Sequence, residues 1–414
     1  MKETKFKQTD IGLIPEDWEV KKLSDEFEIQ TGLTPSTEDE SYYGSEYLFV
    51  SPADLGERKF ITKTGKMLSK KGFALCRKYP AGSILYTCIG STIGKCGVAQ
   101  FELTSNQQIN AVLPNKNYEC GYIYYVLYCK ADEIKNMAGL QAVPIINKTE
   151  FGNTLIQVPP TKGEQESIAN ALSQMDDLIE VLDEQIEKKI LIKQGAMQQL
   201  LTGKTRLQGF SRPWVEKTIE ELGCLTGAGV DKKNVEDETP VRLVNYLDVF
   251  KRDVIFDRDL DFWTTADETK LQQCDVQEGD VFFTPSSEMP YDIALSAVAK
   301  ESMPNVCYSY HIYRLRFSES IDLDFKAYMF KTADFYNQAN VTCEGSGKRY
   351  VISLTKFRKM KIFYPSDIDE QHAIANILST MDDEIQTLQE ERDKYVLVKQ
   401  GMMQQLLTGK IRLN

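Results

Sequence analysis

The sequence contains only two histidines, His311 and His372, and its nine cysteines form no Cys-x-x-Cys pair. These absences argue against a zinc site and against a Ser-His enzyme, because both need imidazole or paired thiolates at defined spacing. No run of 18 apolar residues could span a bilayer, and the first residues lack the apolar region of a secretory signal. We therefore expect a cytoplasmic protein with reduced thiols, no metal and no membrane partner.

Motifs that hold nucleotides or support methyl transfer are also missing. The stretch from Gly90 to Lys95 resembles a phosphate-binding loop, but three residues instead of four separate its glycines and no Ser or Thr follows the lysine. No Asn/Asp-Pro-Pro-aromatic tetrad is present. The carboxylate pairs Asp176-Asp177 and Asp382-Asp383 are most simply explained as solvated helix faces. We expect a chain that is not an enzyme and that binds no cofactor.

The net charge of −12 argues against a nucleic-acid partner, but the positive charge is concentrated in two segments. Residues 56–97, the first basic island, contain nine basic residues and one acidic residue, a local charge of +8. Residues 344–361, the second basic island, contain six basic residues and one acidic residue, a local charge of +5. Such islands are suited to local contact with DNA phosphates.

An internal repeat organises the chain. Residues 164–207 recur as residues 370–413 at a constant offset of 206, with 28 of 44 positions identical. The segments that precede each copy are far less alike. The chain is therefore a tandem duplication whose two heads have diverged and whose two connecting segments have not.

Each repeated segment has the periodicity of a long amphipathic helix without an internal proline, and Gly203 and Gly409 are expected to end the two helices. The predicted apolar seam follows the alternating 4-3 spacing of a coiled coil. Its members are Ile168, Leu172, Met175, Ile179, Leu182, Ile374, Leu378, Met381, Ile385 and Leu388.

Connectivity predicts that the two helices pair antiparallel. A helix of about 40 residues is roughly 60 Å long, whereas a head of about 160 residues has a radius of gyration of only about 15 Å. The second head is too compact to run back along a parallel helix. We therefore predict one head at each end of the helix pair, with an approximate two-fold axis between the halves.

The heads are predicted to be mixed α/β, so that the fold class is α/β with two globular recognition domains joined by two long antiparallel coiled-coil helices. Strands are expected at residues 47–50, 83–87, 109–113, 241–244, 280–284 and 312–317, and helices near residues 120–137 and 323–339. The expected domains are residues 1–163 and 208–369 for the heads, with helices at 164–207 and 370–414.

Polar and basic residues in predicted turns are suited to contact DNA, because Lys and Arg hold phosphates while Ser, Thr, Asn, Gln and Arg reach base edges. The candidates in the first head are Lys63, Lys66, Lys70, Lys71, Arg77, Ser91, Thr92, Lys95, Asn106, Gln107, Gln108, Asn147 and Lys148. Those in the second head are Ser286, Ser287, Tyr310, His311, Lys348, Arg349 and Tyr350.

Several motifs carry a resemblance to a known family. They are Ile14-Pro-Glu-Asp-Trp18 at the start of a head, Gly90-Ser-Thr-Ile-Gly-Lys95, Ser105-Asn-Gln-Gln108, Glu164-Gln165 opening a helix, and Gln198-Gln-Leu-Leu-Thr-Gly-Lys204, with the two helix motifs present twice. Over essentially its full length the chain resembles the specificity subunits of type I restriction–modification systems. In the second head, Ser286-Ser-Glu-Met-Pro-Tyr-Asp292 departs from the Gly-rich segment of the first.

The resemblance implies a non-catalytic subunit in which each head recognises one half of a bipartite sequence in double-stranded DNA. It also implies two partner methyltransferase subunits, which bind S-adenosylmethionine and methylate adenine, and restriction subunits that join through them. Two other hypotheses stay open on the sequence: an enzyme that cleaves or methylates DNA itself, and a coiled-coil scaffold that binds only proteins.

Overall fold

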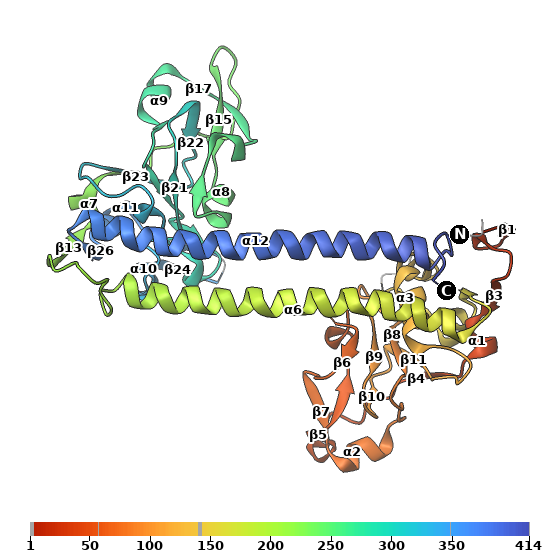
Figure 1. Cartoon of the computed structure of the whole chain (residues 1–414). Coiled ribbons are helices and arrows are strands. Elements are labelled where there is room, and N and C mark those ends of the chain that lie inside the picture. Colours follow the sequence, from red (N-terminus) through yellow and green to blue (C-terminus); the bar gives the residue numbers. More distant parts are fainter. Residues whose placement is uncertain (1–3, 57, 140–142, 348, 414) are drawn as a thin grey trace. The chain divides into compact units, whose positions relative to one another are not determined.

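The computed structural model describes residues 4–56, 58–139, 143–347 and 349–413. The chain forms two compact units, the first made of residues 1–185 and 388–414 and the second of residues 186–387. Each unit contains one α/β head and a part of each of two long helices, α6 (Lys162–Leu200) and α12 (Ile368–Leu406) (Figure 1). None of the helices in the described residues is both long and apolar enough to cross a membrane.

The first head combines short strands with short helices. Its strands are β1 (Phe6–Thr9), β2 (Gly12–Pro15), β3 (Glu19–Lys22), β4 (Ile29–Thr31), β5 (Tyr43–Val50), β6 (Phe60–Ile61), β7 (Lys66–Leu68), β8 (Ile84–Thr87), β9 (Cys96–Ala99), β10 (Thr104–Ser105), β11 (Ile109–Val112) and β12 (Leu155–Val158). Its helices are α1 (Leu23–Glu26), α2 (Lys70–Leu75), α3 (Cys120–Cys129), α4 (Ala131–Asn136) and α5 (Lys148–Gly152), with 3-10 turns η1 (Glu40–Tyr42) and η2 (Pro52–Asp54).

A five-stranded sheet of order β4-β11-β8-β9-β6 forms the centre of this head. Successive residues of β8 point to opposite faces, as a pleated strand requires: Ile84 and Tyr86 lie in one apolar cluster and Leu85 in another. The first cluster also contains the buried side of α3, the start of α6 and Leu406 near the end of α12. The head core and the helix ends of the first unit are therefore one apolar core.

The second head has a similar set of elements. Its strands are β13 (Trp214–Thr218), β14 (Gly223–Thr226), β15 (Thr239–Val244), β16 (Val254–Ile255), β17 (Trp263–Ala266), β18 (Asp275–Val276), β19 (Val281–Phe283), β20 (Ser286–Ser287), β21 (Ser296–Ala299), β22 (Met303–Tyr308), β23 (Tyr313–Phe317), β24 (Glu344–Ser346), β25 (Arg349–Val351) and β26 (Lys361–Pro365). Its helices are α7 (Ile219–Leu222), α8 (Tyr246–Lys251), α9 (Glu268–Gln273), α10 (Ala333–Thr342) and α11 (Leu354–Arg358), with 3-10 turns η3 (Asp257–Asp259), η4 (Pro290–Asp292) and η5 (Phe325–Ala327).

The two heads share one topology despite their divergent sequences. The central sheet of the second head has the order β14-β23-β19-β21-β16, which matches β4-β11-β8-β9-β6 strand for strand. Phe282 of β19 faces one cluster while Val281 and Phe283 face another, as in β8. Ile374, Leu378 and Leu200 join the core of the second unit, at positions that the repeat relates to Ile168, Leu172 and Leu406.

The long helices run antiparallel in each unit, which confirms the prediction. In the first unit, Lys399 pairs with Asp176 and Arg392 pairs with Asp183. The later residue of α12 thus pairs with the earlier residue of α6, as in antiparallel helices. In the second unit, Lys193 pairs with Asp382. The predicted stops are also confirmed, because Gly203 and Gly409 follow the helices with φ of +68° and +66°, a conformation that favours glycine.

The predicted helix at residues 323–339 is wrong in its extent. Residues 325–327 form the 3-10 turn η5, and a separate helix, α10, runs from Ala333 to Thr342. The hydroxyl of Thr332 accepts a hydrogen bond from the Phe335 amide and starts the second helix. A side-chain cap in the middle of an apolar pattern thus divides what the periodicity suggested was continuous.

Candidate nucleic-acid interface

Four segments of the first head meet at one end of its central sheet. Cys88 lies in the turn after β8. Its amide donates to the Gln108 carbonyl oxygen (2.8 Å), and its carbonyl oxygen accepts from the Ile146 amide (2.8 Å). The Leu33 amide, just after β4, donates to Ser105 O (3.0 Å). We call the predicted residues in these turns the first polar cluster: Ser91, Thr92, Asn106, Gln107 and Gln108.

Hydrogen bonds within the first polar cluster hold its amides in place. The Asn106 side chain accepts from the Gln108 amide (3.1 Å) and donates to the Gln108 side-chain oxygen (3.0 Å). The Gln107 side-chain oxygen accepts from the hydroxyl of Thr34, a residue that the sequence analysis missed. Gln107 and Ser91 are exposed. The cluster therefore offers ordered donors and acceptors to an outside partner.

The second head builds the same arrangement with different side chains. The Ser309 amide donates to Val244 O (3.0 Å), as the Asn106 amide donates to Val50 O (3.0 Å). The Ser309 hydroxyl accepts from the His311 amide, as the Asn106 side chain accepts from that of Gln108. Ser309–His311 thus occupy the place of Asn106–Gln108.

The turn after β19 completes this second site. The Ile352 amide donates to Pro285 O (2.9 Å), as Ile146 does to Cys88 in the first head. Ser286 and Ser287 of β20 pair with Val351 and Tyr350 of β25. We call the residues brought together here the second polar cluster: Ser286, Ser287, Tyr310, His311 and Arg349.

A groove lies beside the second polar cluster, and we call it the second groove. Four predicted residues line it: Ser286, Ser287, His311 and Arg349. Its other lining residues include Tyr246 and Phe250 of α8, Glu288, Met289 and Asp292. The aromatic side chains of α8 were missed, although two aromatics four residues apart on a short helix form a pair on one face.

The first basic island divides between two roles. Lys63, Lys66, Lys70, Lys71 and Arg77 are exposed. Lys71 pairs with Asp39 (3.4 Å), and the Arg77 guanidinium donates to the Thr31 carbonyl at the end of β4. These residues leave cationic groups on the surface of the head.

Arg58 and Lys59, counted in the same island, instead hold the head to α6. Arg58 pairs with Glu180 (2.5 Å), and the Lys59 ammonium donates to the Ser173 hydroxyl (2.5 Å) and lies 4.7 Å from the Tyr125 ring centroid. Burial lowers the pKa of Lys59, and the Asp176 carboxylate partly opposes that effect. Local charge in the sequence therefore overstates the surface available to phosphates.

In the second basic island, residues 344–361, three of the six basic side chains are bonded within the head. Lys356 pairs with Glu344 (2.5 Å), Lys361 pairs with Glu216 (2.7 Å), and Arg358 donates to Leu225 O (2.9 Å). Arg349 is exposed and makes no side-chain hydrogen bond or ion pair with the described residues, whereas Lys348 lies outside the described residues. Tyr350 is half-buried on β25.

The remaining candidates have mixed surroundings. Thr92 is half-buried, and Lys95 is exposed beside Gly56, whose φ of +98° and close Lys95 side chain leave little room for another residue. Asn147 caps α5 by accepting from the Glu150 amide (2.9 Å), and Lys148 is exposed in the first turn of that helix. The cap accounts for Asn147 without DNA.

The ten predicted seam residues fall into three groups. Buried with head residues are Ile168, Leu172, Ile374 and Leu378. Buried farther along the helices are Leu182 and Ile385, at 6% and 8% exposure. Partly buried are Met175, Ile179, Met381 and Leu388.

Asp176 and Asp382 are not simple solvated carboxylates, which corrects the sequence analysis. Asp176 binds Lys399 across the helix pair and accepts from the Tyr125 hydroxyl of the first head. Asp382 binds Lys193 in the same way and accepts from the Tyr328 hydroxyl (2.8 Å) of the second head. Each aspartate therefore connects two helices and one head.

A second ion pair repeats near the helix ends. Arg412 binds Glu164 (2.8 Å) and Asp17 (2.9 Å), and these hydrogen bonds raise the pKa of the guanidinium. Arg206 binds Glu370 (2.6 Å) at the equivalent position of the second unit. The adjoining glutamines accept from head amides in both units, Gln165 from Glu119 and Gln371 from Asp322. We call each such set of contacts a joint.

A family model described as the type I restriction modification DNA specificity domain matches residues 15–191 and again residues 211–394. The two matches correspond to the two halves of the repeat and together cover most of the chain. The chain belongs to this specificity family.

Individual relatives agree with the family model. The MjaVIII specificity subunit of Methanocaldococcus jannaschii is 26% identical over 430 residues, covering 100% of this chain and 97% of the relative. The MjaIX specificity subunit of the same organism is 36% identical over 187 residues, or 43% of this chain and less than half (42%) of the relative. The crystal structure of a type I restriction-modification S subunit from M. genitalium matches this chain with a TM-score of 0.55 and 15% identity. The match covers 97% of this chain and 98% of that one, and it shows a similar fold.

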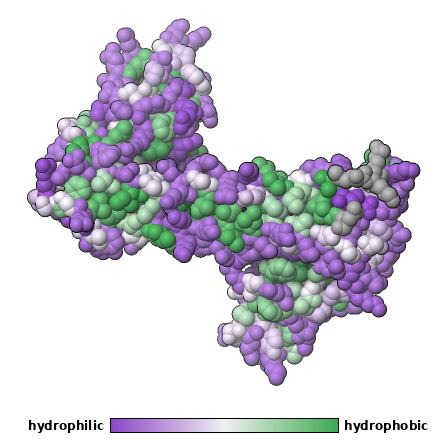
Figure 2. All heavy atoms as spheres, viewed as in Figure 1, coloured by the Kyte–Doolittle hydropathy of each residue, from purple (hydrophilic) through white to green (hydrophobic). Residues whose placement is uncertain are grey.

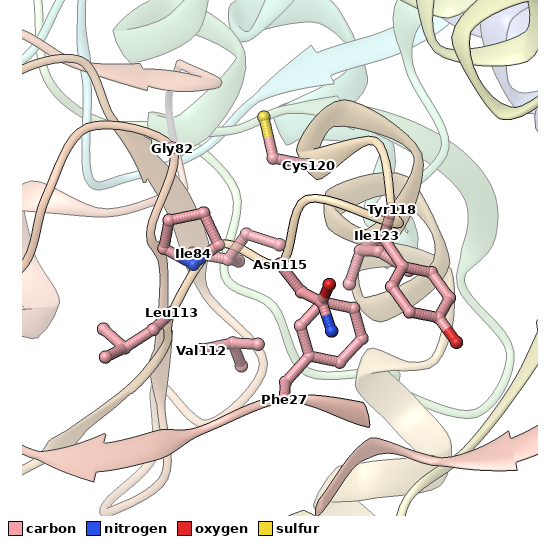
Figure 3. A pocket seen from close by; sticks show the side chains of 10 residues that line it. Phe27, Gly82, Ile84, Val112, Leu113, Asn115, Tyr118, Cys120 and Ile123 are labelled. Atoms are coloured by element: carbon pink, nitrogen blue, oxygen red, sulfur yellow. The ribbon is translucent and has the colours of Figure 1, made fainter. Parts of the chain in front are cut away.

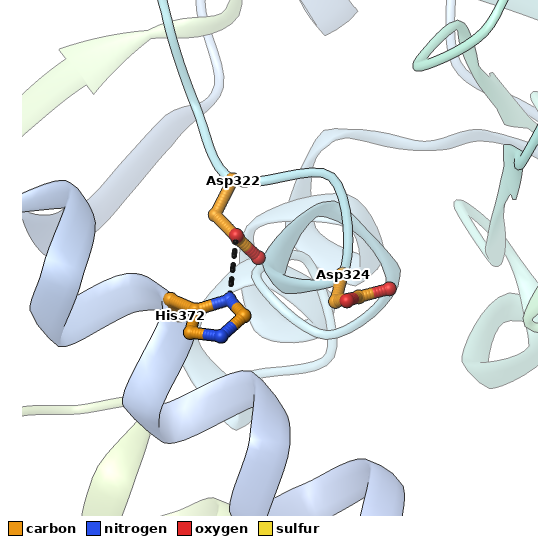
Figure 4. Close-up of side chains that lie close together, drawn as sticks. All are labelled: Asp322, Asp324 and His372. Atoms are coloured by element: carbon orange, nitrogen blue, oxygen red, sulfur yellow. Dashed lines mark hydrogen bonds and ion pairs between the residues drawn. The ribbon is translucent and has the colours of Figure 1, made fainter.

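Two other features of this specificity-family chain lie outside the polar clusters. A small cavity in the first head is lined by core residues such as Phe27, Ile84 and Ile123, with Cys120 at its margin (Figure 3). Nδ1 of His372 lies 3.1 Å from an Asp322 oxygen, with Asp324 nearby (Figure 4). Asp324 also pairs with Lys300, so both carboxylates of this group have protein partners.

Proposed function

We propose that this chain is a DNA-recognition subunit without catalytic activity, in which each head recognises one half of an asymmetric bipartite sequence in double-stranded DNA. The observation that carries the proposal is the pair of polar clusters. Equivalent backbone hydrogen bonds hold each cluster at the corresponding end of its own head's central sheet, yet the first offers Asn and Gln amides beside Ser and Thr, and the second offers Ser, Tyr, His and Arg. Two heads with one scaffold and different chemistry are suited to two different half-sites.

Exposed cations on the first head supply the sequence-independent part of binding. Lys66 lies on β7 and Lys70 on α2, and the Arg77 guanidinium donates a hydrogen bond to the Thr31 carbonyl at the end of β4. Contacts of this kind fix the orientation of a protein on the duplex, and base contacts then select the sequence. The long helices would hold the two heads for simultaneous contact with the two half-sites.

The long helices also offer a surface for two copies of one partner. Leu191 and Ile192 of α6 are 61% and 49% exposed, and the equivalent Leu397 and Val398 of α12 are 67% and 43% exposed. Figure 2 shows apolar side chains on the surface along the helices. Because the repeat duplicates this exposed segment, we propose that each copy binds one adenine methyltransferase subunit, which holds S-adenosylmethionine, and that restriction subunits join through these.

Selection from a random duplex library tests DNA recognition. The full chain with its methyltransferase should enrich two separate half-sites at a fixed gap, and methylome sequencing of a host that expresses the complex should show adenine methylation in the same sequence. Binding that depends on salt but enriches no sequence would contradict the proposal. Absence of DNA binding together with methyltransferase binding would instead favour a protein-binding scaffold.

Charge substitutions in the exposed helix segments test the partner sites. Leu191→Glu and Leu397→Glu should each remove one methyltransferase copy from the complex, and the double variant should remove both, as measured by native mass spectrometry. Val341→Glu is the matched control, because Val341 is 88% exposed on α10 of the second head. Full occupancy in the double variant would place the partner elsewhere.

A further inference from the structure

The aromatic wall of the second groove differs from the equivalent part of the first head, within the residues that the structure describes. Its aromatic wall is α8, which begins at Asn245 with an Asp248 carboxylate accepting from the Asn245 amide (2.8 Å). In the first head the same cap, formed by Ser51 and Asp54 (2.8 Å), leads only into the 3-10 turn η2. The second head therefore has Tyr246 and Phe250 where the first has a short turn without aromatic side chains.

The groove is lined by side chains of both charge signs. Glu288 and Asp292 line it together with Tyr246, and burial and these two carboxylates raise the pKa of the Tyr246 phenol while a hydrogen bond with Ser287 opposes that effect. His311 lies near Arg349 and Lys232, which together with burial lower its pKa. Across the described residues, neither Glu288 nor Asp292 makes a side-chain hydrogen bond or ion pair, and the same holds for Arg349. Three charged groups are thus left available in one groove.

A carboxylate that faces DNA is repelled by the phosphates, and a hydrogen bond accepted from a base can offset that repulsion. In the major groove the donors are the N4 amino group of cytosine and the N6 amino group of adenine. Adenine also presents the N7 acceptor beside N6, which repels a carboxylate, so that cytosine is the favoured partner. Arginine is suited to the other base of that pair, because it donates to O6 and N7 of guanine.

We propose that the second groove recognises a C·G base pair in the major groove of the second half-site, with Glu288 and Asp292 facing the cytosine and Arg349 facing the guanine. This rests on the proposed function, since it requires that the second head contact DNA. The apolar side chains of Phe250 and Met289 border the groove and would limit water around these hydrogen bonds.

The test is selection from a random duplex library by the full chain in complex with its methyltransferase. The parent should enrich one or more C·G pairs in the half-site assigned to the second head. Arg349→Ala should lower the discrimination for that pair by about 5- to 150-fold, the range for one good bidentate contact, and Arg349→Lys should lower it less. The first half-site should keep its base frequencies in every variant.

A double substitution distinguishes recognition from a structural role. Glu288→Gln with Asp292→Asn keeps the shape of both side chains but adds donors, so that the preferred base should change from cytosine towards adenine. Glu236→Gln with Asp261→Asn removes the same charge from exposed positions outside the groove and should leave the selected sequence unchanged.

The outcomes separate this inference from the proposed function. Two enriched half-sites with no C·G preference sensitive to Arg349, Glu288 or Asp292 would overturn the inference and leave the function standing. Equal relaxation of both half-sites in the variants would also overturn it, because the effect would not be local. A parent that enriches no sequence would contradict the proposed function itself.

Discussion

The two heads differ most where their scaffolds are most alike. Both carry the same five-stranded sheet order, and both place a polar turn over the same strand ends. In the first head that turn carries Asn106, Gln107 and Gln108, whereas in the second Ser309 is buried and the turn presents Tyr310 and His311 beside the aromatic α8. Buried strand residues thus preserve the scaffold, and the exposed turn residues can change without disturbing it.

The joints show the opposite behaviour. Glu164 with Arg412 and Glu370 with Arg206 are the same residues at the same repeat positions, and Asp176 with Lys399 matches Asp382 with Lys193. These contacts connect each head to both helices. A change there would alter the attachment of a head, whereas a change in a polar cluster alters only what the head contacts.

The largest expected effect tests whether the two cores are equivalent. Leu172 and Leu378 are both 0% exposed, so Leu172→Ala and Leu378→Ala should each lower the free energy of unfolding of its own unit by about 3 kcal/mol. Urea unfolding can be followed in each unit by fluorescence, because Trp18 lies in the first unit and Trp214 and Trp263 lie in the second.

Leu191→Ala is the control for that experiment, since Leu191 is a 61% exposed leucine on α6 and should change stability little. If one of the two buried substitutions cost less than half as much as the other, the heads would not be held to the helices equivalently.

An intermediate effect concerns the charge of the two heads. Helix α2 of the first head begins with Lys70 and Lys71 after the Ser69 cap, whereas α9 of the second begins with Glu268 and Thr269 after Asp267. Replacing Lys70 and Lys71 together by Ala should weaken binding to many sequences alike and reduce the slope of log affinity against log salt by about 2 units at most. Filter binding over a salt series measures this slope.

The reverse change sharpens the comparison. Glu268→Lys with Thr269→Lys should make the salt slope steeper if α9 approaches DNA as α2 does, while Lys394→Ala, on an exposed position of α12, should leave it unchanged. A slope unaffected by loss of Lys70 and Lys71 would mean that α2 faces away from the duplex.

The smallest effect concerns pH. Burial, followed by the charges of Lys232 and Arg349, lowers the pKa of His311 below its usual value of 6.5. The unfolded chain then binds the proton more tightly, so this contribution to stability is complete above about pH 6.5 and is lost as pH falls through the lowered pKa. His311→Gln introduces the residue found at the equivalent position of the first head, Gln108, and should remove that part of the pH dependence.

NMR can follow this titration directly, because the chain has only two histidines and His372→Gln assigns the two signals. A His311 that titrates at or above 6.5 would contradict the lowered pKa that burial, Lys232 and Arg349 are expected to cause. The stability difference between pH 7.5 and 5.5 in parent and variant provides the second measurement.

The sequence predicted the parts of the fold that depend on periodicity and repetition. The long helices, their antiparallel pairing and the glycine stops followed from the spacing of apolar residues and from the constant offset. The predicted strands of the central sheets lie close to β8, β11, β19 and β23. Short-range patterns suffice for such elements because burial on one or both faces dictates the residue types.

The site was predicted less well, because its chemistry depends on contacts between distant segments. Lys59 and Lys63 look alike in the sequence, but Lys59 is half-buried and bonded to Ser173 of α6, whereas Lys63 is exposed. The role of Asp176 depends on Tyr125, 51 positions before it in the chain, and on Lys399, more than 200 positions after it. The groove beside α8 likewise requires β20, the turn at His311 and β25 to converge, which no local pattern specifies.

The composition of the first unit has a consequence for how the protein is made. Residues 388–414 complete that unit, and Met403, Leu406 and Leu407 fill its core beside Ile168 and Trp18. The ribosome releases these residues only after the whole of the second unit, residues 186–387, has been translated. The head that is synthesised first is therefore finished last, and a nascent chain that stops before residue 388 can complete its second head while the first still exposes an unfilled apolar core to chaperones and proteases.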